Sequence, residues 1–250
     1  MTRNETEAER LDRLARDRVE RPLPKRFYKD VQVSDDNRIL LDGRGVKTPL
    51  KAPLQLPNRR LADAVAAEWM AQVDVINPAL MPLTKLSNTA IDRATAERQH
   101  VIDEIVQYAN SDLVLYRASE PENLVALQAE LWDPVLKWAA NKHGMVFHPV
   151  SGITHRAQDA EALARLRAGI SALDNWRLTA AYLLTTLTGS ALLAVMLEQG
   201  AVTPETCWAA ANLDEDFQVS QWGEDWEARL RREARGREFN GLVQFLGLLE

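Results

Sequence analysis

The pattern of apolar and polar residues changes from short runs to helical spacing near residue 60. Residues 26–57 contain short runs of Val, Ile, Leu and aromatic residues, separated by turn signals at Asp35-Asp36-Asn37 and Gly43-Arg44-Gly45. Turn signals at this hairpin spacing predict a small antiparallel sheet. We expect its strands near residues 26–33, 38–42, 45–49 and 53–56.

Helical spacing begins with Leu61, Val65, Trp69 and Val73, which lie four residues apart on one stripe. Similar patterns predict helices near residues 84–94, 95–110, 121–142, 157–173, 176–198, 204–212, 213–233 and 236–248, with one more strand at 145–150. A small sheet followed by helices predicts an α+β fold. We therefore expect a small antiparallel β-sheet N-terminal domain followed by a mainly helical, bundle-like C-terminal domain. The expected divisions are a charged arm at 1–24, a β-rich α+β domain at 25–115 and a mainly helical domain at 116–250.

The segment at 178–197 carries no charge and is long enough to span a bilayer. However, threonine, glycine and serine dilute its apolar character, and no basic cluster marks a cytoplasmic side. Because helices that are apolar all round are normally buried, the segment predicts a core helix and no membrane span. A membrane-associated adaptor built on this helix is the weaker alternative.

Composition narrows the functional classes. The 250 residues are 46% hydrophobic and 26% charged, as in an ordinary globular protein, and the net charge of −6 gives no general attraction to nucleic acid. Cys207 is the sole cysteine, which excludes an intrachain disulfide and a thiolate metal cluster. The arm at 1–24 lacks the apolar stretch of a signal peptide and is too acidic for a mitochondrial transit peptide, which predicts a bacterial cytoplasmic protein.

The chain lacks the common catalytic motifs. It contains no phosphate-binding loop, G-x-G-x-x-G, G-x-S-x-G or H-E-x-x-H sequence. The spacing of its histidines does not place them on one helix face, which argues against a metal site. Asp92 and Asp112 are typical of carboxylates that cap helices or bind backbone amides. We expect no catalytic residue, metal, cofactor or small-molecule substrate; the alternative is a small carboxylate-dependent hydrolase or isomerase.

The run from Leu213 to Leu230 has an unusual distribution of apolar residues. On an ideal helix, Leu213 and Phe217 lie on one side, and Trp222 and Trp226 lie on roughly the opposite side. Such a helix is buried on two sides, broken near Gly223, or apolar toward something else.

Acidic residues begin the same run. Glu215 projects onto the tryptophan stripe between Trp222 and Trp226, while Asp214 and Asp216 point to its flanks. A charge on an aromatic face is either paired inside the fold or presented to a partner. The internal partner would be an arginine such as Arg229 or Arg232. Gln218 lies one turn from Trp222 and could bind backbone at a contact.

Several fragments together resemble one family. They are RFYKDVQV, LDGRGVKTP, AAEWMAQ, NPALMPLTKLSNTAID, YANSDLVLYRA, QAELWDPVLKW, TTLTGSALLAVML and LDEDFQVSQWGEDWEARLRR. Their order resembles the Atp-twelve type of ATP synthase assembly chaperone over residues 25–232. Asp214 and Asp216 depart from the family pattern, in which longer glutamates are common.

The resemblance implies a binding function without catalysis. Family members bind the free alpha subunit of the ATP synthase catalytic head and cover its apolar surface until the beta subunit arrives; exposed apolar patches are otherwise aggregation liabilities. The resemblance also places function-sensitive acidic positions in the LDEDFQ motif. The residues expected to bind the alpha subunit are Glu215, Asp214, Asp216, Gln218 and Trp222.

Overall fold

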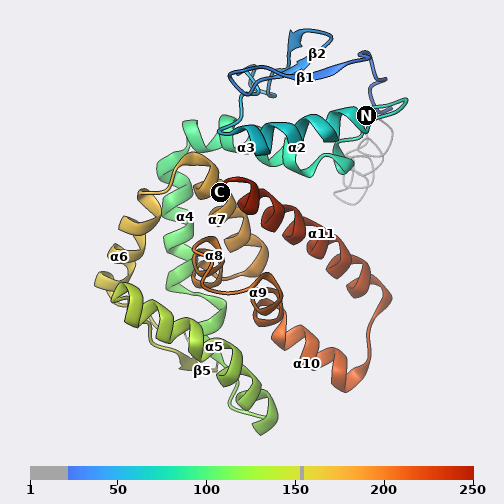
Figure 1. Ribbon diagram of the computed structural model, residues 1–250. Helices are drawn as coiled ribbons and strands as arrows, with labels where there is room; N and C mark the ends of the chain where they lie inside the picture. Colours follow the sequence, from blue (N-terminus) through green and yellow to red (C-terminus); the bar gives the residue numbers. More distant parts are fainter. Residues whose placement is uncertain (1–21, 153–154) are drawn as a thin grey trace, which may run out of the picture.

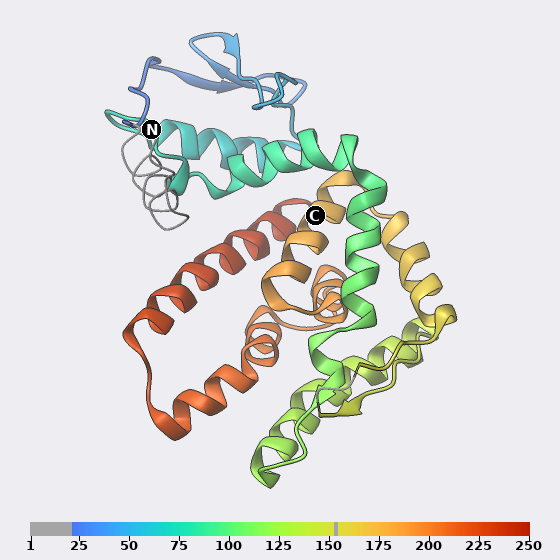
Figure 2. The same ribbon diagram turned by 180° about the vertical axis from the view of Figure 1, so that it is seen from behind.

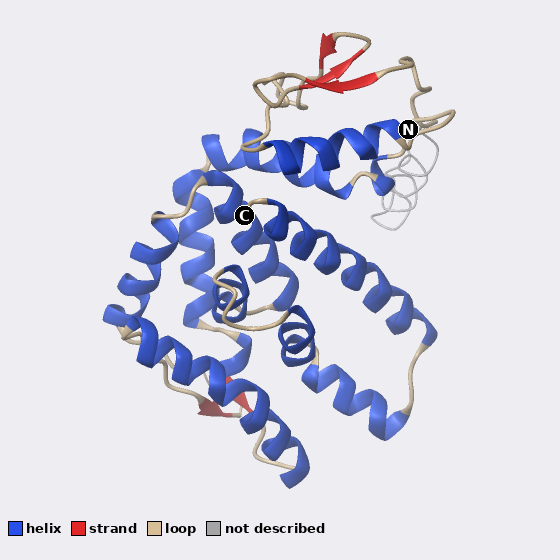
Figure 3. Ribbon diagram, viewed as in Figure 1, coloured by secondary structure: helices blue, strands red, loops and turns tan. Residues whose placement is uncertain are grey.

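A computed structural model describes residues 22–152 and 155–250 of the protein. Figure 1 shows a small sheet lying over α2 and α3 at one end, with the other helices forming the larger part of the molecule. The larger sheet is N-terminal, and helices dominate the rest (Figure 3). This arrangement confirms the predicted α+β fold. Most of the predicted arm at 1–24 lies outside the described residues.

The sheet is built from three short antiparallel strands. Their order is β1 (Val31–Val33), β2 (Ile39–Leu41) and β3 (Arg44–Gly45). The turns use Asn37, Asp42 and Gly43, with φ of 63°, 48° and 77°, a left-handed region that these residue types tolerate. The predicted strands were too long. The predicted strand at 53–56 was wrong, because that segment contributes only the isolated bridges Lys47–Pro53 and Arg38–Gln55.

The first helices cover the sheet. Asn58 caps α2 (Arg59–Met70) by accepting a hydrogen bond from the Leu61 amide at 2.9 Å. Leu61 and Val65 are buried as the stripe predicts, whereas Val73 is exposed because the helix ends before it. The 3₁₀ turn η1 (Pro78–Leu80) leads into α3 (Pro82–Ala96) and α4 (Arg98–Asn110).

The middle of the chain adds a long helix and a second, minimal sheet. The 3₁₀ turn η2 (Leu113–Leu115) precedes β4 (Tyr116–Arg117), and α5 (Glu122–His143) ends at Gly144, whose φ is 64°. β4 pairs in parallel with β5 (Val150–Ser151). The strand predicted at 145–150 therefore reaches strand geometry only at its last residue.

The uncharged segment is buried but is not one helix. After α6 (Ala160–Ser171), the chain forms α7 (Asn175–Thr188) and α8 (Ala191–Glu198), separated by Gly189 with φ of 72°. Ser190 caps α8 by accepting from the Leu193 amide at 3.0 Å. The predicted continuous helix was wrong, while its predicted burial is confirmed. Among the described residues, no helix combines the length and the apolar character needed to cross a bilayer.

The chain ends with α9 (Pro204–Ala211), α10 (Leu213–Trp222) and α11 (Trp226–Leu248). One apolar core runs from Ile39 in the sheet through Leu192 in α8 to Phe245 in α11. This core crosses the predicted boundary between 115 and 116, and the division into two domains stays a prediction. Seen from behind in Figure 2, α11 runs back from the periphery toward α7 and α3, and its contacts with both helices anchor it.

Candidate protein-binding surface

Two residues, Gly223 and Asp225, set where α10 ends and α11 begins in the region of the predicted site. Gly223, with φ of 83° and ψ of 170°, ends α10, and the carboxylate of Asp225 then caps α11 by accepting from the Ala228 amide at 3.0 Å. The chain therefore turns back on itself at the periphery of the molecule, away from the sheet (Figure 1). The break near Gly223, one of the alternatives for this run, is confirmed, and the helix predicted at 213–233 was wrong.

Asp214 fastens α10 to α5. Its Oδ1 accepts a hydrogen bond from Nε2 of the buried Gln128 at 2.8 Å. The other end of the same amide accepts from the Ala118 backbone at 2.8 Å. Because Gln128 is buried, this chain of hydrogen bonds fixes the start of α10.

Glu215 and Asp216 connect α10 to α11. Glu215 Oε2 lies 3.2 Å from Nη1 of Arg235, and Asp216 forms an ion pair with Arg232. The hydrogen bond from Arg232 to Asp216 raises the pKa of that guanidinium. All three carboxylates also lie in the first turn of α10, where the helix dipole favours negative charge.

The internal partner of Glu215 is therefore neither of the arginines named from the sequence. Arg232 pairs with Asp216 instead, and Arg229 lies 3.9 Å from Glu233 on its own helix. Arg232 and Arg235 are three residues apart and share one face of α11, and in the structure both pair with carboxylates of α10.

Large apolar side chains are exposed on both sides of the turn. Trp222 is 81% exposed and Trp226 is 63% exposed, and Leu230 follows one turn later on α11. We call Trp222, Gly223, Trp226 and Leu230 the α10–α11 tip. The predicted stripe joining Trp222 to Trp226 was wrong, because the two tryptophans belong to different helices. Gln218 is also exposed on α10.

The tip was only partly predicted, because Trp226 and Leu230 were not among the expected binding residues. Their signal is an apolar pair four residues apart in a segment that is otherwise charged on every side. Isolated exposed apolar residues are common, but three large apolar side chains exposed around one turn are typical of interaction surfaces. The tip can therefore bind an apolar surface, and the three carboxylates lie at the opposite end of α10.

The carboxylates considered for catalysis have structural partners. Asp92 accepts from the Thr48 hydroxyl at 2.6 Å and from the Leu50 amide at 3.1 Å. Asp112 accepts from the amides of Val114 and Leu192 at 3.2 and 3.0 Å, and its burial raises its pKa to about 6. Both observations confirm the expected roles in backbone binding.

The histidines also have protein neighbours. His143 lies 3.1 Å from Gln199, His148 lies 3.2 Å from Asp159, and His155 lies 3.2 Å from Tyr116. His100 lies 3.6 Å from Glu104 on α4. In the part of the chain that the structure describes, no three residues of the metal-binding types gather at one point.

The described structure is an α+β protein with a candidate protein-binding surface, and comparison with known proteins places it in a family. A model of the family described as ATP12 chaperone protein matches residues 25–140. Protein atp12, mitochondrial, from Schizosaccharomyces pombe is 28% identical over 222 residues, which cover 81% of this chain and 76% of that protein.

Solved structures extend the similarity to nearly the whole chain. Atp12 from Paracoccus denitrificans is 36% identical with a TM-score of 0.85, covering 91% of this chain and 99% of that chain. A protein from Agrobacterium tumefaciens, named as a candidate chaperone, is 45% identical with a TM-score of 0.87, covering 94% and 90%. The chain belongs to the ATP12 chaperone family.

Proposed function

We propose that this protein is an assembly chaperone for the F-type ATP synthase, and that it binds the free alpha subunit of the catalytic head. It would prevent aggregation of alpha until the beta subunit arrives. Membership of the ATP12 family supports the role of a chaperone. The identity of the client, the alpha subunit, is the part that we propose. The relatives from Paracoccus and Agrobacterium support a bacterial protein, for which we propose cytoplasmic action without enzymatic turnover.

The observation that carries the proposal is the exposure of Trp222 and Trp226 on the two sides of the α10–α11 turn. Aromatic side chains dominate the binding energy of many interfaces, because they bury a large area with few rotatable bonds. An unassembled subunit exposes apolar surface that needs such a partner. The start of α10 is held in place, since Asp214 binds α5 and Glu215 binds α11.

The proposed binding residues divide into two roles. We assign direct contact with the alpha subunit to Trp222 and Gln218, which are exposed. Glu215, Asp214 and Asp216 hold α10 in place through their internal partners. The carboxylates of Glu215 and Asp216 also keep exposed surface, which supports a second role in which they face basic groups of the client.

Co-expression of the protein with the alpha subunit, followed by size-exclusion chromatography, tests the proposal. We expect a one-to-one complex with the unaltered chain. The double variant Trp222→Ser/Trp226→Ser should lose capture at least about tenfold, because it removes the aromatic anchors. Leu50→Ser is the matched control, since Leu50 is an exposed apolar residue beside the N-terminal sheet.

Two results would contradict the proposal. The first is an unaltered chain that forms no complex with alpha. The second is a double variant that binds alpha as tightly as the Leu50→Ser control. Comparison of thermal unfolding for all three proteins would show whether any loss of capture reflects a loss of folded protein.

A further inference from the structure

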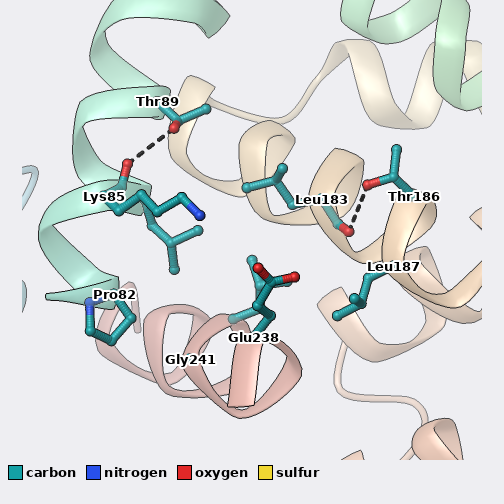
Figure 4. A pocket seen from close by; sticks show the side chains of 10 residues that line it. Pro82, Lys85, Thr89, Leu183, Thr186, Leu187, Glu238 and Gly241 are labelled. Atoms are coloured by element: carbon teal, nitrogen blue, oxygen red, sulfur yellow. Dashed lines mark hydrogen bonds between the residues drawn. The ribbon is translucent and has the colours of Figure 1, made fainter. Parts of the chain in front are cut away.

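A second apolar surface lies between α3, α7 and α11. It is a groove of about 320 Å³, and Figure 4 shows that side chains from all three helices line it. Its apolar lining comes from Leu86, Leu183, Leu187 and Leu242. A groove of this size accommodates a few side chains of a bound segment.

The polar groups at the edge of the groove are of two kinds. The hydroxyls of Thr89 and Thr186 each donate to a carbonyl of their own helix at 3.0 Å, so both are already satisfied. Lys85 from α3 and Glu238 from α11 are different. Among the described residues, neither of their side chains has an ion-pair or hydrogen-bond partner.

Lys85 and Glu238 face the open space of the groove from different helices. Figure 4 shows the ammonium group of Lys85 and the carboxylate of Glu238 both directed into it. They do not form an ion pair with each other in the structure. With respect to the residues that the structure describes, Lys85 and Glu238 thus present opposite unpaired charges beside an apolar floor.

We propose that this groove holds an amphipathic segment of the client polypeptide. An apolar side chain of the segment enters between the leucines, an acidic residue faces Lys85, and a basic residue faces Glu238. Opposite charges on separate walls favour a polypeptide that carries one residue of each sign, whereas a fatty acid supplies only one charge. This inference rests on the proposed function, because the client is the same alpha subunit.

The position of the groove supports a shared client. Trp226 begins α11 and Glu238 lies twelve residues further along the same helix, which corresponds to about 18 Å along its axis. A client lying beside α11 can therefore contact the tip and the groove together. Two linked contacts strengthen binding more than either one alone.

Charge reversal at the groove tests the inference. Lys85→Glu and Glu238→Lys alter exposed side chains without described partners, so we expect unchanged thermal unfolding. Each should weaken capture of purified alpha subunit about tenfold, because like charges then oppose each other. Thr186→Trp should weaken capture further by filling the groove. Lys137→Glu on α5 is the matched control, since Lys137 is exposed and does not line the groove.

A photo-crosslinking amino acid at position 186 identifies the occupant. We expect mass spectrometry to find it joined to an alpha-subunit peptide containing an apolar residue with an acidic and a basic neighbour. The inference is overturned if both charge reversals bind alpha like Lys137→Glu, or if purified protein carries a lipid in the groove. If the charge reversals bind alpha normally but Trp222→Ser/Trp226→Ser loses capture, the groove inference fails and the proposed function stands. Failure of the unaltered chain to capture alpha would overturn both.

Discussion

Glu215 in the first turn of α10 and Arg235 of α11 form an ion pair that joins the two helices, with 3.2 Å between Oε2 and Nη1. Arg235 also donates to the Leu187 carbonyl of α7 at 3.3 Å, and its guanidinium lies 5.8 Å from the centre of the Trp208 ring. The pair therefore links the start of α10 to the helical core. It also leaves about a third of each side chain exposed, with relative areas of 36% and 34%.

This partial exposure predicts different effects on stability and on binding. Glu215→Gln should lower the free energy of unfolding by less than about 1 kcal/mol, because solvent-accessible ion pairs contribute little. If the carboxylate also faces the client, the same variant should weaken capture of alpha about tenfold. Urea unfolding and a binding titration on one preparation measure the two effects. Unchanged capture would remove Glu215 from the proposed contact surface.

Asp214 should affect stability more than Glu215. Asp214→Ala leaves the Nε2 group of Gln128 without its acceptor, and Gln128 is buried. An unsatisfied buried donor costs about 1–3 kcal/mol, so the free energy of unfolding should fall by that amount. Asp216→Ala is the control within the same helix turn, since its ion pair with Arg232 is more exposed. Equal urea midpoints for the two variants would contradict the assigned roles.

Trp69 should stabilise the junction of the sheet with α2. Its ring lies 5.8 Å from that of Tyr28, and its carbonyl accepts from the Tyr28 hydroxyl at 2.7 Å. Trp69→Ala should lower the free energy of unfolding by about 3 kcal/mol. This is near the lower end of the range for replacing a core tryptophan by alanine, because part of the Trp69 side chain is exposed. Tyr28→Phe removes only the hydrogen bond and should cost about 1 kcal/mol. If Trp69→Ala unfolds at the same temperature as the unaltered chain, the assigned structural role of Trp69 is contradicted.

Local periodicity explains which parts of the fold were predictable. The four-residue stripe placed Leu61 and Val65 in the core, and both side chains are fully buried. Trp69, the third member of the stripe, is only partly buried. These successes depend on residues close together in sequence.

Both helix breaks carry the same local signal. Gly189 is followed by the capping residue Ser190, and Gly223 is followed two residues later by the capping residue Asp225. Glycine at the end of one helix and a capping side chain at the start of the next are the usual termination and initiation signals. The apolar spacing continues through both positions, which is why it predicted longer helices.

The remaining interactions join residues that are distant in sequence. Met81 precedes α3 without capping it by its side chain, and the carboxylate of Glu68 instead accepts from the amides of Leu83 and Thr84 at 2.7 and 2.8 Å. Burial raises the pKa of Glu68 against the effect of these hydrogen bonds. Likewise, the pairing of Glu215 with Arg235 depends on how α11 folds back, which residue spacing alone does not specify.

The carboxylate of Asp112 makes a prediction about pH. It is fully buried beside the backbone of α8, and burial raises its pKa from 3.8 to about 6, although hydrogen bonds from Ser190 and Leu192 oppose the shift. The folded protein therefore holds this proton more tightly than the unfolded chain does. Its contribution to stability is complete below pH about 4 and is lost as the pH rises through about 6.

Comparison of the unaltered chain with Asp112→Asn isolates this contribution from other titrating groups. A pKa difference of about 2 units corresponds to about 3 kcal/mol. The unaltered chain should lose about that much of its stability relative to the variant between pH 4 and pH 8, because only Asp112 must give up a proton in a buried site. Urea unfolding of both proteins across this range measures the difference. A difference that stays constant with pH would show that Asp112 does not titrate in the way its burial predicts.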